Sequence, residues 1–219
     1  SNPTTAAFEE RVASLEGGIG AVATSSGQAA EFLTITTLAG AGDHVVAAAS
    51  IYGGTYTLLA TTLGRLGIET TFVDNTSVDG FAAAINDRTK LLYTEVIGNP
   101  TGAIADLEAL ADVAHAHGLP LVVDATFATP YLCRPMEFGA DIVLHSATKF
   151  LGGHGTSIGG VISEAGNFDW TASGRFPRFT DVIPTYNGLR WHDNFGEYAF
   201  CTALRSEQLV QGGLRHRRP

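Results

Sequence analysis

Hydrophobic and polar positions along the chain follow two alternating patterns. Helical periodicity marks residues 5–16, 27–38, 53–66 and 106–117. Between these segments lie short apolar or β-branched runs at 44–49, 68–73, 90–96, 121–124, 141–145 and 158–162. Continuous apolar strands separated by helices are typical of a mostly parallel sheet that is covered on both faces. The pattern therefore predicts an α/β protein with three layers, a sheet between two layers of helices.

Polar residues collect directly after several of the expected strands. They are Ser50, Tyr52, Glu95, Asn99, Asp124, Thr126, Ser146, Thr148 and Lys149. In a sheet of this kind the ligand crevice lies beyond the carboxyl ends of the strands. The sequence therefore predicts that these side chains share one site.

The two ends of the chain differ from the middle. Ser1 to Thr4 is typical of a helix start, so we expect that the chain begins inside a longer polypeptide. Beyond Trp170 the sequence is rich in aromatic residues and glycine, and its hydrophobic periodicity is no longer clear. Residues 208–219 are basic and patternless, and we expect them to be disordered.

Length, composition and charge limit which domains and partners this protein is expected to have. With 219 residues and 45% apolar content, one domain with a large core is expected. The net charge of −9 and only 13 Lys and Arg argue against a nucleic-acid partner.

No apolar stretch approaches the roughly 20 residues of a bilayer span, so no membrane partner is expected. Two cysteines and no secretion signal indicate a reducing cytoplasm. His115 and His117 do not share a helix face, and we expect no metal site.

Lys149 is the first candidate for chemistry. It follows the apolar strand 141–145 and two hydroxyl residues, and it precedes the glycine-rich segment 152–155. A lysine desolvated by such neighbours has a lowered pKa and can form a Schiff base. The same local pattern also fits an ordinary loop lysine at a helix start.

Asp124 is the second candidate, because it ends a strand that is expected to be buried on both faces. A buried carboxylate needs a partner. A protonated pyridine nitrogen is one such partner, and the carboxylate then keeps the ring cationic as an electron sink. An Asp that caps the following turn is the alternative.

The segment 24–30 combines small residues with the start of a helix, an arrangement that favours a phosphate site. A plain Ser N-cap is the alternative. The Gly18-x-Gly20 run lacks the flanking strand, helix and acidic residue of a dinucleotide fingerprint, so that interpretation is weak. Tyr52, among small residues, can stack on a flat ring or pack under a loop. Asn99 can reach a ring substituent or shape its turn.

These motifs occur together and in order: SSGQAA at 25–30, YGGT at 52–55, GNP at 98–100, VDATFATP at 123–130 and HSATKFLGGH at 145–154. As a set they resemble the transsulfuration family of pyridoxal-phosphate (PLP) enzymes, over residues 1 to about 207. The segments 95–100, 126–135, 155–162 and 166–186 look most like its O-acetylhomoserine sulfhydrylase branch.

The resemblance implies a PLP-dependent transferase large domain of fold type I over residues 1–207, with PLP as cofactor. It implies Lys149 as the Schiff-base lysine and Asp124 as the partner of the ring nitrogen. Ser146 and Thr148 would bind phosphate with the backbone of Gly27 and Gln28. Tyr52 would stack on the ring and assist catalysis, and Asn99 and Thr126 would lie beside it. Ala125 stands where Asn is common, a change expected to be tolerated.

The implied reaction is replacement of acetate at the γ-carbon of O-acetyl-L-homoserine by sulfide or a thiol. Lys149 would remove the α-proton, and the products would be of the homocysteine or methionine type. Members of the family form homo-oligomers, dimers of dimers, whose subunits share active-site residues. Their Tyr and Arg upstream of this chain's start, and the C-terminal small domain with the Arg that binds substrate, are expected to be absent here.

Two alternatives remain. The first is a cystathionine γ-synthase or γ-lyase of the same family, which uses the same core residues. The second is a truncated, inactive fragment that only binds PLP.

Overall fold

The computed structural model of the chain describes residues 2–208. Its strands are β1 (Gly20–Thr24), β2 (His44–Ala48), β3 (Glu69–Val73), β4 (Thr89–Glu95), β5 (Leu121–Asp124), β6 (Ile142–His145) and β7 (Gly160–Glu164). Its α-helices are α1 (Pro3–Glu16), α2 (Gly27–Leu38), α3 (Gly53–Thr57), α4 (Val78–Ala84), α5 (Leu107–Ala116), α6 (Thr129–Leu132), α7 (Pro177–Thr180), α8 (Trp191–Phe195) and α9 (Ala199–Ala203). Two π-helical segments, η1 (Leu58–Leu63) and η5 (Leu204–Gln208), and three 3₁₀ segments, η2 (Pro135–Phe138), η3 (Pro184–Tyr186) and η4 (Gly196–Tyr198), complete the described elements.

The seven strands form one sheet in the order β1-β7-β6-β5-β4-β2-β3. Strands β3, β2, β4, β5 and β6 pair in parallel, whereas β7 runs antiparallel to both β6 and β1. The prediction of a mostly parallel sheet is therefore confirmed. The parallel strands end at a common edge, and that edge carries the site described below.

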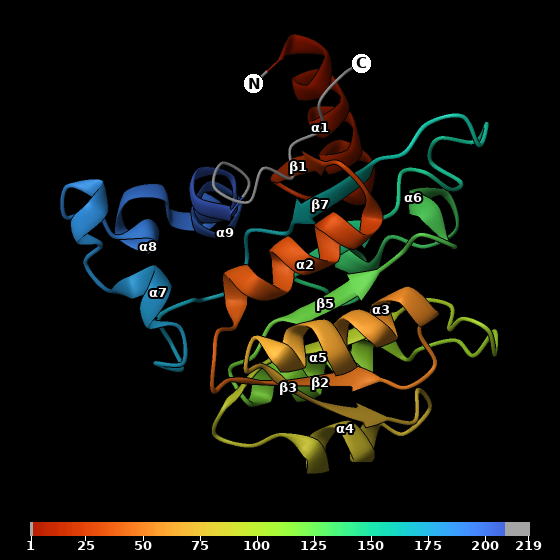
Figure 1. Cartoon of the computed structure of the whole chain (residues 1–219), viewed down its shortest axis with the longest axis horizontal. Helices are drawn as coiled ribbons and strands as arrows, with labels where there is room; N and C mark the ends of the chain where they lie inside the picture. The colour runs from red at the N-terminus through yellow and green to blue at the C-terminus, as the bar shows by residue number, and fades with distance from the viewer. Residues whose placement is uncertain (1, 209–219) are drawn as a thin grey trace.

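Helices cover both faces of the sheet, which confirms the three-layer architecture (Figure 1). Helix α1 packs through Val12 and Ala13 on Ala21 of β1. The neighbouring residue Val22 points to the opposite face, where α2 and α3 lie and Leu33 joins the core. The connections β1–α2–β2 and β2–α3–β3 travel in the same direction along the sheet, so right-handed crossovers place α2 and α3 on the same face.

Capping residues fix both ends of α1 and the start of α2. The side chain of Asn2 accepts the N–H of Thr4 at 2.9 Å, and Gly17 ends α1 at φ 78°, a left-handed conformation that glycine adopts without steric cost. The hydroxyl of Ser26 accepts the N–H of Ala29 at 3.1 Å and so caps α2. Ser26 is therefore the N-cap of α2, the alternative that the sequence analysis set beside a phosphate site.

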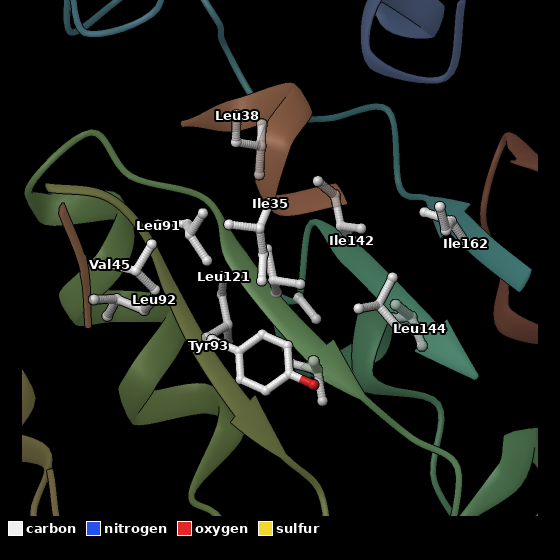
Figure 2. Close-up of a cluster of buried hydrophobic side chains, with 14 of the residues drawn as sticks. Ile35, Leu38, Val45, Leu91, Leu92, Tyr93, Leu121, Ile142, Leu144 and Ile162 are labelled. Atoms are coloured by element: carbon white, nitrogen blue, oxygen red, sulfur yellow. The ribbon is translucent and has the colours of Figure 1, made fainter. Parts of the chain in front are cut away.

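The core lies between the sheet and the helices on each face. Figure 2 shows Ile35 and Leu38 of α2 above apolar side chains of the central strands. Leu91 and Tyr93 of β4 are fully buried in this cluster. The continuous apolar strands of the sequence are thus buried on both faces, as their composition predicted.

Two segments depart from the sequence expectation. Residues 20–24 form β1, so the stated lack of a strand beside Gly18 and Gly20 is wrong; the strand follows these glycines, whereas a dinucleotide fingerprint requires one before them. The region beyond Trp170 is ordered into short helices around an aromatic cluster. Trp170 lies 4.4 Å from Phe179 between ring centroids, and Trp191 is fully buried. Helices of four or five residues are too short to show periodicity.

The predicted disordered tail, residues 208–219, lies outside the described residues except for Gln208, the last residue of η5. Within residues 2–208, no helix combines the length and the apolar character needed to cross a membrane. No cluster of three or more His, Cys, Asp or Glu side chains within the same part of the chain is arranged to hold a metal ion.

Candidate active site

A cavity of about 750 Å³ opens at the carboxyl ends of the parallel strands. The nine residues that the family resemblance assigns to the site all line it: Gly27, Gln28, Tyr52, Asn99, Asp124, Thr126, Ser146, Thr148 and Lys149. Of the two other polar residues expected at the site because they follow strands, Glu95 lines this cavity and Ser50 does not. The nine come from four strand ends and the start of α2, as much as 122 residues apart between Gly27 and Lys149. The topology therefore brings together what the sequence placed after separate strands.

Asp124 forms the floor of the cavity. It is the last residue of β5 and only 9% exposed, and its Oδ1 accepts the N–H of Thr126 at 2.7 Å. The hydroxyl of Thr126 accepts the N–H of Ser146 at 2.8 Å and also hydrogen-bonds to Asp124. Burial raises the pKa of Asp124, and the hydrogen bonds from Thr126 oppose that rise. Asp124 thus caps its turn and faces the cavity at the same time.

The start of α2 supplies an anion site. The hydroxyl of Ser26 accepts the N–H of Ala29, and the carbonyl of Ser26 accepts the N–H of Ala30. Within residues 2–208, no acceptor meets the N–H groups of Gly27 and Gln28, which are among the four that every helix start leaves free. A Cβ added at Gly27 would lie 2.6 Å from the Cβ of Ser146. Glycine is therefore required for the two segments to approach.

Lys149 and Thr148 lie beyond the end of β6. The hydroxyl of Thr148 donates to the carbonyl of Gly159 and accepts its N–H, both at 3.1 Å, and so fixes this loop. Lys149 lines the cavity but is exposed. The expectation that its neighbours desolvate it is wrong for the described residues. The reason is that the loop after β6 leaves the sheet and carries Lys149 to the cavity wall.

Tyr52 and Asn99 are held by a buried acid, Glu95, which the sequence analysis placed at the site without a specific role. Glu95 ends β4, and its Oε1 accepts the N–H of Tyr52 at 2.7 Å while its carboxylate also accepts the N–H of Asn99. Burial first, and the charge of Asp124 second, raise the pKa of Glu95 to about 8. Gly54 lets the Tyr52 ring lie close, since a Cβ there would come within 2.5 Å of the ring.

Two further residues were missed. Glu31 lines the cavity and is 3% exposed, although its charge is an isolated one in the otherwise uncharged helix 27–38, a signal that was available in the sequence. His145 bonds to Glu16 of α1 through Nε2, and both side chains are fully buried. This pair fixes the end of β6 immediately before Ser146. No local pattern marks it, because its partners lie 129 residues apart.

The fold and the cavity define a class of protein. An αβα sandwich that combines a lysine, a buried carboxylate and a helix-start anion site at the carboxyl ends of its strands has the architecture expected of a PLP-dependent transferase of fold type I.

Residues 1–188 match the model of the Cys/Met metabolism PLP-dependent enzymes, and the chain belongs to this family. A homocysteine synthase of Schizosaccharomyces pombe is 51% identical over 97% of this chain and 50% of its own length. An O-acetyl-L-homoserine sulfhydrylase of Leptospira meyeri is 50% identical over 90% of this chain and 44% of its own.

The fold matches solved structures of the same kind. A putative O-acetylhomoserine (thiol)-lyase of Campylobacter jejuni superposes with a TM-score of 0.94 at 33% identity, over 98% of this chain and 53% of that one. That structure contains a pyridoxyl-lysine monophosphate residue. The chain spans about half the length of the relatives it matches.

The family's cofactor is PLP, and the cavity fits it. The free N–H groups of Gly27 and Gln28 suit a phosphate at one end. Asp124, which is 9% exposed and lines the cavity, suits a cationic ring nitrogen. Lys149 on the wall provides an amine.

Proposed function

We propose that the whole protein catalyses γ-replacement on O-acetyl-L-homoserine, with sulfide or a thiol as second substrate and acetate as the leaving group. The observation that carries this proposal is the shared cavity of Lys149 and the buried Asp124, with the start of α2 beside them. The names of the relatives support the choice of substrate.

The bound cofactor supplies an electron-accepting ring for the charge left at the substrate's α-carbon. Lys149 Nζ would hold the cofactor and would act as the base for the proton of that carbon. The carboxylate of Asp124 would pair with the ring nitrogen, and its hydrogen bonds with Thr126 keep it in place.

The remaining predicted residues bind and orient. The backbone N–H groups of Gly27 and Gln28 bind the phosphate together with the hydroxyls of Ser146 and Thr148. The Thr148 hydroxyl must turn from Gly159 to do so. Tyr52, Asn99 and Thr126 line the same cavity, where Tyr52 would stack on the ring and Asn99 and Thr126 would lie beside it.

The assembly proposed here is a homotetramer in the cytoplasm. In it residues 1–207 act as the cofactor-binding domain. Phe127, Phe150 and Ile158, which line the cavity, are exposed, and so are Tyr131 at 91% and Leu132 of α6. Exposed large apolar side chains are typical of subunit contacts. The cysteines of the described chain, Cys133 and Cys201, are both free, which agrees with a reducing compartment.

Lys149 is tested by absorption and chemical trapping. Protein with added PLP should show a band near the visible edge that is lost in Lys149→Ala. Borohydride reduction and peptide mapping should then label Lys149. Lys90, the other lysine of the chain, is the control, because it is engaged by the carbonyl of Arg175. Label on Lys90, or on neither lysine, contradicts the assignment.

The reaction itself is tested with the full-length protein. O-acetylhomoserine with sulfide should yield homocysteine and acetate. Turnover with cysteine as second substrate would favour a cystathionine γ-synthase, and thiol release from methionine a γ-lyase. A band without turnover of any of these would indicate a fragment that binds the cofactor alone.

A further inference from the structure

Asn75 holds the backbone of the loop that carries Tyr52 to the cavity. Ser50 lies in this loop, between β2 and α3 and two residues before Tyr52. Asn75 is 4% exposed, and its Oδ1 accepts the N–H of Ser50 at 2.7 Å. Its Nδ2 donates to the carbonyl of the same residue at 2.9 Å. The side chain of Asn75 therefore binds both polar backbone groups of Ser50, although Asn75 does not line the cavity.

The amide of Asn75 continues the pairing of β2 with β3 beyond the ends of the two strands. The main-chain pairing ends with the N–H of Ala49, which donates to the carbonyl of Val73 at 2.7 Å. The chain then turns toward α4, which begins at Val78. An amide side chain offers the same donor and acceptor as a peptide group. Asn75 thus takes the place of a main-chain partner and extends the paired edge to Ser50.

The loop after β4 packs against the same two residues. A Cβ added at Gly98 would lie 2.8 Å from the carbonyl oxygen of Ser50 and 3.0 Å from Nδ2 of Asn75. The hydroxyl oxygens of Ser50 and Thr101 lie 2.5 Å apart. Ser50 is therefore fixed by the end of β3 and by the loop after β4 together.

The backbone of this segment decides where the Tyr52 ring lies. Tyr52 is 50% exposed, and a side chain that is half exposed is positioned mainly by its backbone. The N–H of Tyr52 donates to Oε1 of Glu95 at 2.7 Å. That bond fixes the backbone at Tyr52 itself, and the two bonds from Asn75 fix it two residues earlier. The segment therefore enters the cavity in one defined direction.

We propose that Asn75 is a positioning residue for Tyr52, whose amide fixes the backbone of Ser50 and thereby the place of the Tyr52 ring in the cavity. The proposal rests on the proposed function insofar as Tyr52 meets the ring of the cofactor. Because Asn75 does not line the cavity, its effect on cofactor binding must pass through this segment.

The order of the segment is measured on the cofactor-free, full-length protein by amide hydrogen exchange with mass spectrometry. In Asn75→Ala the peptide 49–53 should exchange about tenfold faster, because the N–H of Ser50 loses its acceptor. Asn86→Ala is the matched control, since Asn86 also makes two side-chain hydrogen bonds, but before β4 at the opposite end of the strands. Unchanged exchange in Asn75→Ala, or equal acceleration in both variants, overturns the proposal.

A double-mutant cycle on cofactor binding shows whether Asn75 acts through Tyr52. The dissociation constant of PLP, titrated by absorbance, should rise about threefold to tenfold in Asn75→Ala, as for the loss of one neutral hydrogen bond. In a Tyr52→Ala background the same substitution should change it by less than about twofold, because the ring is absent. Equal weakening in both backgrounds would mean a general structural role. Wild-type affinity in Asn75→Ala would mean that Glu95 suffices. Either result overturns the proposal.

A second variant covers a failure of Asn75→Ala to fold. Asn75→Leu keeps the volume of the side chain and removes both hydrogen bonds to Ser50. It should accelerate exchange in the peptide 49–53 and weaken PLP binding by the same factors as Asn75→Ala. Wild-type values of both in Asn75→Leu would show that Asn75 only fills space, and they would overturn the proposal.

The proposed function fails separately. If Lys149→Ala keeps the visible band, the cofactor assignment falls, while hydrogen exchange still decides whether Asn75 holds the segment. If the band depends on Lys149 but exchange in the peptide 49–53 is unchanged in Asn75→Ala, the cofactor assignment stands and the role of Asn75 falls.

Discussion

Replacement of Glu95 by Gln should change how the free energy of unfolding of the cofactor-free protein depends on pH. Glu95 is 5% exposed and accepts the backbone N–H groups of Tyr52 and Asn99. Burial and then the charge of Asp124 raise its pKa from 4.5 to about 8. The folded protein therefore holds this proton more tightly than the unfolded chain does.

The sign follows from proton linkage. Stability from the tightly held proton is fully present below the ordinary pKa of 4.5 and is lost as pH rises toward 8. Since each pKa unit corresponds to about 1.4 kcal/mol, the whole loss is about 5 kcal/mol. Gln cannot ionise. The stability of Glu95→Gln relative to wild type should therefore increase by about 5 kcal/mol between about pH 4 and about pH 9.

Urea denaturation at several pH values measures this difference directly. Glu164→Gln is the matched control, because Glu164 is equally buried and accepts the N–H of Cys201 at 2.9 Å, with its pKa raised by burial to about 7. Its difference should reach only about 3 kcal/mol and level off near neutral pH. A Glu95→Gln difference that is flat with pH, or that is complete near pH 5, would refute the reasoning.

Three further predictions concern binding, catalysis and the core. Gly27→Ala should weaken PLP binding at least about tenfold, because its Cβ would lie 2.6 Å from that of Ser146, whereas Gly64→Ala, with no atom within 4 Å, should leave the dissociation constant unchanged. Asp124→Asn, where it still binds PLP, should lose most exchange of the substrate's α-proton, measured by NMR in deuterated water; near-normal exchange would reduce Asp124 to a turn cap. Leu33→Ala, at a fully buried site, should lower the free energy of unfolding by about 2–5 kcal/mol in urea, and a loss below about 1 kcal/mol would contradict the packing described.

The sequence by itself determined the layers of the fold and most of the cavity lining. Strand composition is a local property, and burial on both faces requires the unbroken apolar runs seen at 121–123 and 142–144. Because parallel strands end at one edge, residues placed after separate strands had to meet there. That is why Asp124, Thr126 and Lys149 could be assigned to one site before their distances were known.

Only the tertiary structure decided the partners of buried polar groups. Asn75 meets Ser50 across 25 residues, and Glu16 meets His145 across 129. Hydrogen bonds over such separations depend on how helices cross the sheet, which no local pattern records. The same holds for the exposure of Lys149 and for the aromatic cluster around Trp170, whose short helices are stabilised by long-range ring contacts. The sequence placed the functional residues at the edge of the sheet, and packing set the burial and the hydrogen-bond partners of these residues.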